Sequence, residues 1–123
     1  MAVTAAQRQH WQQRLDAEAA AVSERAAAAR QLAQDAAERL LQRWPDLQGI
    51  WLFGSLHDGR FGLSSDVDLA VAGLPGDALL NAMALLEPLQ HGEIVIDLVR
   101  LEDLDPHWQQ RIRERAEVLR ADS

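Results

Sequence analysis

A single apolar stripe at helical spacing runs through the first 44 residues. This segment has no glycine or proline and is dense in Ala, Gln, Arg and Glu, which favour helix. Its apolar residues recur at steps of three and four, and part of the stripe repeats every seven residues, at Leu15, Val22, Ala29 and Ala36. One helix of this length would be about 60 Å long, and two helices, the second capped by Ser23, are the alternative.

Two interpretations of this stripe stay open. In the first, the C-terminal half of the helix packs on the core and the rest is solvated. In the second, the alanines form a partner or dimer surface, because small side chains let helices approach closely. We therefore treat residues 1–44 as an N-terminal helical extension and residues 45–123 as the domain proper.

Three short strands are predicted after Pro45, which ends the helix. The apolar run 50–53 is typical of a buried strand and leads into Gly54. Residues 66–72 alternate with period two, which puts Asp66 and Asp68 on one face of a strand. In the third strand, 93–99, Asp97 has the opposite parity to its apolar neighbours. The carboxylates of both strands can therefore face one place.

Two further helices complete the predicted fold. One is capped by Asp77 and runs to about Gln90, and Pro88 either ends it or distorts its last turn. The apolar side of this helix is Leu79, Leu80, Met83, Leu86 and Leu89. The other begins at Pro106 and runs to about Arg120, with inward residues Trp108, Ile112, Ala116 and Leu119. The order of elements indicates an α/β (α+β) sandwich with a small mixed or antiparallel sheet and helices on one side.

Composition narrows the class of protein. The chain has 123 residues and no cysteine, so disulfides and thiolate metal sites are excluded and a cytoplasmic setting is expected. No apolar run reaches the roughly 20 residues of a membrane span. The net charge of -7 argues against a nucleic-acid surface. Tyrosine is absent, so any tyrosine that this protein modifies belongs to a partner.

The aspartates predict a site for a hard cation. Carboxylates at positions i and i+2 of a strand suit Mg²⁺, which takes one or two carboxylates together with substrate phosphates. Asp97 supplies a third ligand beside Asp66 and Asp68. Two ions roughly 4 Å apart would stabilise both oxygens of an in-line displacement at phosphorus. An EF-hand loop starting at Asp66 is excluded, because its sixth position is Val71 and not glycine.

Gly54 and Ser55 supply the complementary half of this site. Glycine lets a phosphate approach the backbone, and the following N–H groups with the Ser55 hydroxyl can bind the β- and γ-phosphates of a nucleoside triphosphate. Arg60 is a candidate for neutralising phosphate charge. Gly54, Ser55 and Arg60 are therefore the predicted nucleotide-binding residues.

Together these motifs resemble a known family. Gly54-Ser55, ten residues, Asp66-Val67-Asp68-Leu69 and a later Asp97 are similar to the nucleotidyltransferase superfamily of the DNA polymerase β type. The small size and the ending "RIRERAEVLR" resemble the minimal nucleotidyltransferases (MNT) that act as antitoxins beside HEPN toxins. The resemblance covers about residues 45–120 and implies a polymerase β-like nucleotidyltransferase fold.

The resemblance also implies an activity. It assigns Mg²⁺ to Asp66, Asp68 and Asp97, with Asp97 as a base for the acceptor hydroxyl, and ATP as substrate. Family members of this kind adenylate a tyrosine of the partner HEPN RNase toxin, which implies an EC 2.7.7 type enzyme in a hetero-oligomer. One departure concerns the loop: the family often has arginines after Gly-Ser, whereas here Leu56-His57-Asp58-Gly59 follows, and Arg60 is the available substitute.

Two other functions stay open. The chain could be a non-catalytic antitoxin that neutralises a toxin by direct contact, which the missing arginines and the long helix favour. It could also be a small-molecule adenylyltransferase, which the absence of a substrate domain disfavours.

Overall fold

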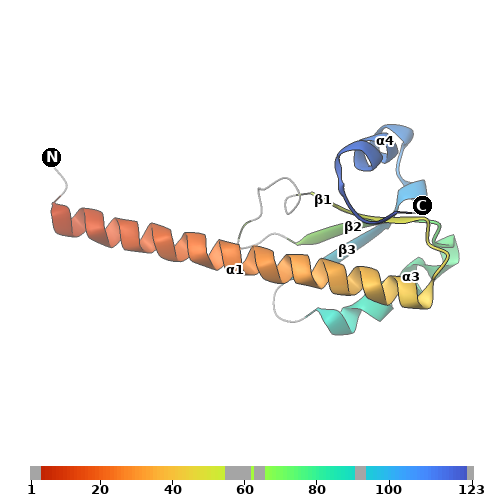
Figure 1. Cartoon of the computed structure of the whole chain (residues 1–123), viewed down its shortest axis with the longest axis horizontal. Helices are drawn as coiled ribbons and strands as arrows, with labels where there is room; N and C mark the ends of the chain where they lie inside the picture. The colour runs from red at the N-terminus through yellow and green to blue at the C-terminus, as the bar shows by residue number, and fades with distance from the viewer. Residues whose placement is uncertain (1–3, 55–61, 63–65, 91–93, 122–123) are drawn as a thin grey trace.

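A long helix lies against a four-stranded sheet in this computed structural model, which describes residues 4–54, 62, 66–90 and 94–121 (Figure 1). The helices are α1 (Ala5–Arg43), α3 (Leu79–Leu86) and α4 (Pro106–Arg115). The strands are β1 (Gly49–Phe53), β2 (Val67–Ala72), β3 (Ile96–Arg100) and β4 (Glu117–Ala121). Short 3-10 turns cover Gly76–Ala78, Glu87–Leu89 and Leu101–Asp103.

Helix α1 is one continuous element of 39 residues. Thr4 caps it: the Thr4 hydroxyl accepts from the Gln7 backbone N–H at 3.1 Å, and the Gln7 side-chain oxygen accepts from the Thr4 N–H at 3.0 Å. The chain does not break at Ser23, so the single-helix alternative is correct. Despite this length, no helix in the described part of the chain is long and apolar enough to cross a membrane.

The C-terminal half of α1 packs on the sheet. Ala29, Ala33, Ala36 and Leu40 have no exposed surface and belong to the main hydrophobic core. Alanine at these positions lets the helix axis lie close to the strands. The core therefore includes residues on both sides of position 44, and the division of the chain into an extension and a domain at that position stays a prediction.

The sheet has the order β3-β2-β1-β4 and is mixed, as the sequence predicts. Strand β1 pairs antiparallel with both β2 and β4, and β2 pairs in parallel with β3. One face of the sheet, which we call the first face, packs under α1 and α3. Its apolar residues are Ile50, Leu52, Val67, Leu69, Val71, Ile96 and Leu98. This confirms the predicted alternation, in which every second residue of these strands points into the core.

The second face is partly covered by α4, which corrects the expectation that helices lie on one side only. Ile112 of α4 packs in a separate cluster with Trp51 and Ala70. The last helix was also predicted to reach Arg120. It ends at Arg115 because residues 117–121 form β4, whose backbone pairs with the edge of β1. Trp108, predicted to point inward, is 48% exposed.

Helix α3 also differs from its prediction. Its buried residues are Ala82 and Leu86, whereas Leu80 is 76% exposed and Met83 is 39% exposed. Asp77 was predicted to cap this helix, but the N-cap residue is Ala78 and no side chain makes a cap hydrogen bond there. Pro88 does end the helix, since Glu87–Leu89 is a 3-10 turn.

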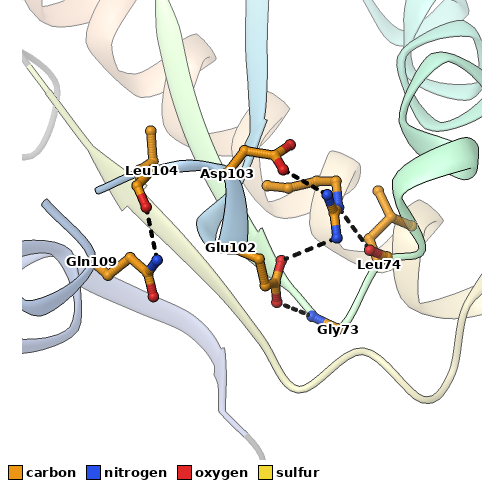
Figure 2. Close-up of polar contacts among 7 residues, drawn as sticks. Gly73, Leu74, Glu102, Asp103, Leu104 and Gln109 are labelled. Atoms are coloured by element: carbon orange, nitrogen blue, oxygen red, sulfur yellow. Dashed lines mark hydrogen bonds and ion pairs between the residues drawn. The ribbon is translucent and has the colours of Figure 1, made fainter. Parts of the chain in front are cut away.

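A polar cluster fixes the ends of β2 and β3 against each other (Figure 2). Arg100, the last residue of β3, donates from Nε to the Leu74 carbonyl at 2.8 Å and from Nη1 to Asp103 at 2.6 Å. Glu102 accepts from the Gly73 N–H at 2.7 Å and lies 3.9 Å from Arg100 Nη2. These contacts hold the turn after β2 beside the end of β3 and so help to set the register of the two strands.

The packing of α1 predicts a steric limit at Ala33. Ala33→Leu should lower the free energy of unfolding by about 1–3 kcal/mol, because the added methyl groups have no space between helix and sheet. Ala28→Leu is the matched control: Ala28 is exposed on the same helix, and its substitution should change stability little. Urea denaturation of both variants measures the two free energies of unfolding. An equal loss at the two positions would contradict the close packing of Ala33 on the sheet.

Candidate functional site

Two aspartates from neighbouring strands lie directly side by side. Asp68 of β2 pairs with Asp97 of β3 on one side and with Phe53 of β1 on the other. Residues paired across a sheet point to the same face, so both carboxylates emerge on the second face, the one that α4 partly covers. Asp97 is exposed and Asp68 is half-buried. The sequence-predicted convergence of these two side chains is therefore a property of the strand register.

Asp66 lies one step before β2. Its Oδ1 accepts from the Val95 backbone N–H at 3.2 Å, and the adjacent Val67 N–H donates to the Val95 carbonyl at 2.9 Å. This exchange holds Asp66 against the segment that leads into β3. Asp66 is therefore placed by backbone contacts near the same end of the strands as Asp68 and Asp97.

The carboxylate of Asp68 is repelled by those of Asp97 and Asp66. The pKa of Asp68 is raised above its ordinary value, first because burial disfavours its charged form and then because Asp97 and Asp66 add negative charge nearby. Elsewhere in the described part of the chain, Glu102, Asp103 and Glu117 form ion pairs with arginines. A bound cation would relieve this repulsion.

Position 54 favours glycine for two reasons: its backbone conformation and its closeness to the Asp68 side chain. It has φ of 78°, a conformation that side chains rarely adopt. A Cβ at this position would collide with Asp68 Oδ2 and would lie 3.1 Å from Asp68 Cγ. Glycine therefore lets the end of β1 pass directly beside the carboxylate. Ser55 and Arg60, the other predicted nucleotide-binding residues, lie outside the described residues.

The donor set fits a magnesium ion that shares its coordination with substrate. All three candidate ligands are carboxylates, the oxygen donors that hard cations prefer. Within the described residues, no group of three His, Cys, Asp or Glu side chains is arranged so that it could hold a metal ion by itself. Mg²⁺ commonly takes only one or two carboxylates and completes its shell with water and phosphate oxygens. The paired aspartates are thus suited to such an ion, and the assignment of ligands stays a prediction.

A pocket of about 380 Å³ opens beside the paired aspartates. Asp68 and Asp97 form its polar wall, and its apolar lining includes Phe53, Met83 and Leu98. Phe53 and Met83 line this pocket but are not among the site residues that the sequence predicts. The position of Phe53 directly before Gly54 was a usable signal, whereas Met83 was assigned to the core because its spacing is helical.

Most of the chain matches a known protein family. Residues 36–123 match the family described as Polymerase beta, Nucleotidyltransferase. No curated protein matches the chain.

Two of the solved structures that are similar to this chain are toxin-antitoxin structures. A crystal structure of a toxin-antitoxin with AMP-PNP is 26% identical, with a TM-score of 0.58 over 73% of this chain and 74% of that chain. A crystal structure of the toxin-antitoxin MntA-HepT is also 26% identical, with a TM-score of 0.53 over 74% of this chain and 72% of that chain.

The raised pKa of Asp68 predicts how stability depends on pH. A carboxyl group whose folded pKa exceeds its unfolded value contributes stability that is complete below the unfolded pKa, ordinarily 3.8, and is lost as pH rises through the folded pKa. Without divalent metal, Asp68→Asn should therefore melt a few degrees above the wild type at neutral pH, and this gain should vanish in acid.

Melting curves from acid to neutral pH test this prediction. Asp46→Asn is the control, since Asp46 is exposed in the turn between α1 and β1 and is not one of the three candidate ligands. A wild type that gains stability relative to Asp68→Asn as the pH rises would contradict the burial and repulsion assigned to Asp68.

Gly54 and Gly73 form a matched pair for a second test. Both have positive φ, 78° and 88°, so alanine at either position should lower the free energy of unfolding by about 1–2 kcal/mol. Only Gly54→Ala also displaces the Asp68 carboxylate, because the Cβ at Gly73 would meet Gln48 instead. The rise in melting temperature on adding Mg²⁺ should therefore shrink in Gly54→Ala and persist in Gly73→Ala. Equal responses of the two variants would show that Gly54 does not shape the predicted cation site.

Proposed function

This chain belongs to the polymerase beta nucleotidyltransferase family, and we propose that it is a Mg²⁺-dependent enzyme that transfers AMP from ATP to a hydroxyl of a partner protein. The observation that carries the proposal is the direct pairing of Asp68 with Asp97, with Asp66 held at the same end of the strands. Repelling carboxylates at this position are a cost to stability, which is expected where a site is built to hold a cation.

The proposed reaction is an in-line displacement at the α-phosphorus. The acceptor hydroxyl oxygen forms the new bond to phosphorus, the bond to the bridging α,β-oxygen breaks, and pyrophosphate leaves. Asp66 and Asp68 would hold Mg²⁺, two ions in the full proposal, and the metal would neutralise charge on the phosphates. Asp97, the most exposed of the three, would take the proton of the acceptor hydroxyl.

The acceptor is proposed to be a tyrosine of another protein. The pocket beside Asp97 combines an apolar lining with a carboxylate wall, which suits an aromatic ring that carries a hydroxyl. This chain contains no tyrosine of its own.

The partner is proposed to be a HEPN-type toxin, which this protein would silence as an antitoxin in the cytoplasm. Support comes from two structures at 26% identity: one described as a toxin-antitoxin with AMP-PNP, the other as the toxin-antitoxin MntA-HepT. AMP-PNP is an ATP analogue, which agrees with ATP as the nucleotide.

The test is transfer of label from α-labelled ATP to the protein encoded beside this gene. We expect Mg²⁺-dependent label on a tyrosine of the partner, and a loss of about 100-fold or more in Asp66→Ala, Asp68→Asn and Asp97→Asn. Asp46→Asn, which changes an exposed aspartate outside the site, should keep full activity. Absence of label with a folded wild type, or full activity of Asp68→Asn, would exclude the proposed reaction.

Neutralisation by contact alone is the second candidate function. The exposed N-terminal half of α1, which leaves a long surface free of the core, favours it. In that case Asp68→Asn would still silence the toxin, while a chain lacking the exposed half of α1 would fail to bind it. Binding and labelling measured on the same variants separate the two functions.

A further inference from the structure

The N-terminal half of α1 extends away from the body of the protein (Figure 1). Residues 5–21 are all exposed and span about 25 Å of helix. Trp11 and Leu15 lie here with 57% of their surfaces exposed. A helix of this length is only marginally stable alone in water, so this segment depends on the packed half of α1 or on a further contact.

The exposed half carries the same stripe that packs on the sheet. From Leu15 the apolar positions continue in steps of four and three through Ala19, Val22 and Ala26 to the buried Ala29. Residues in one such series share one helix face. The face that α1 turns toward its own core therefore continues outward, as a segment that we name the outer stripe: Trp11, Leu15, Ala19 and Val22.

We propose that the outer stripe pairs with the outer stripe of a second copy of this chain, with the two helices antiparallel. Side-chain size supports this orientation. The bulky residues Trp11 and Leu15 come first and smaller residues follow, so an antiparallel pair centred near residue 17 sets Leu15 against Ala19 of the second copy and Trp11 against Val22. A parallel pair would stack tryptophan on tryptophan and leave the alanines facing a gap.

Charge supports the same orientation. Residues 5–15 contain Arg8 and Arg14 and no acidic residue, whereas residues 16–24 contain Asp16, Glu18 and Glu24 and no basic residue. Arg14 and Glu18 flank the outer stripe on the same side, so the antiparallel pair places Arg14 of each copy near Glu18 of the other. A parallel pair would align like charges. This inference does not depend on the proposed function.

The oligomeric state of the full-length chain tests the proposal. Sedimentation or light scattering at micromolar concentrations should give a mass of about 27 kDa, twice the 13.7 kDa of one chain. Ala19→Glu, which puts a charge inside the stripe, should weaken the dimer at least about tenfold. Ala20→Glu adds the same charge to the same turn on the opposite side of the exposed helix and should leave the dimer intact.

A charge exchange tests the orientation. Arg14→Glu should weaken the dimer about tenfold at low salt, and adding Glu18→Arg to the same chain should restore it. Circular dichroism of each variant shows whether helix content is kept.

A wild type that stays monomeric, or a dimer that survives Ala19→Glu, overturns the proposal. A monomer whose binding to the neighbouring gene product is lost in Ala19→Glu and kept in Ala20→Glu also overturns it, and assigns the outer stripe to that partner instead.

Discussion

The parallel register of β2 and β3 is the constraint on which the candidate site depends. It sets Asp68 opposite Asp97, and it also pairs Val67 with Ile96, so the same alignment that buries apolar side chains on one face brings carboxylates together on the other. A shift by one residue would turn the Asp97 carboxylate of β3 toward the core. The packing of the first face therefore supplies the free energy that holds two like charges side by side.

This register is fixed at both ends of the strands. At one end, Asp66 accepts from the Val95 N–H and Val67 donates to the Val95 carbonyl. At the other end, Arg100 and Glu102 bind the turn that follows β2. Backbone groups are the partners at both ends, so the alignment does not rest on hydrophobic packing alone.

Helix α1 has two halves with different surroundings, one packed on the sheet and one exposed. Its alanines at positions 29, 33 and 36 are fully buried and bring the helix close to the sheet, while residues 5–21 are all exposed. The carboxylates of Asp68 and Asp97 emerge on the opposite face of the sheet from the buried half of α1. Contacts made by the outer half could therefore change without moving the strands that carry the aspartates.

The amino-acid sequence leaves open whether residues 1–44 form one helix or two. It does establish that this segment is helical, and it establishes three of the four strands and the side of the sheet from which Asp68 and Asp97 emerge. Those are local properties, because helix propensity and the alternation of apolar residues act within a few residues. It did not determine that residues 117–121 form β4, that Leu80 and Met83 lie outside the core, or that Asp68 faces Asp97 directly. Each of these depends on a segment far along the chain. Strand β4 forms on the open edge of β1, the burial of α3 residues depends on the surface of α1, and the position of Asp68 depends on the register with β3. A strand at an edge is stabilised by the backbone that it meets, and only the tertiary structure decides which backbone that is.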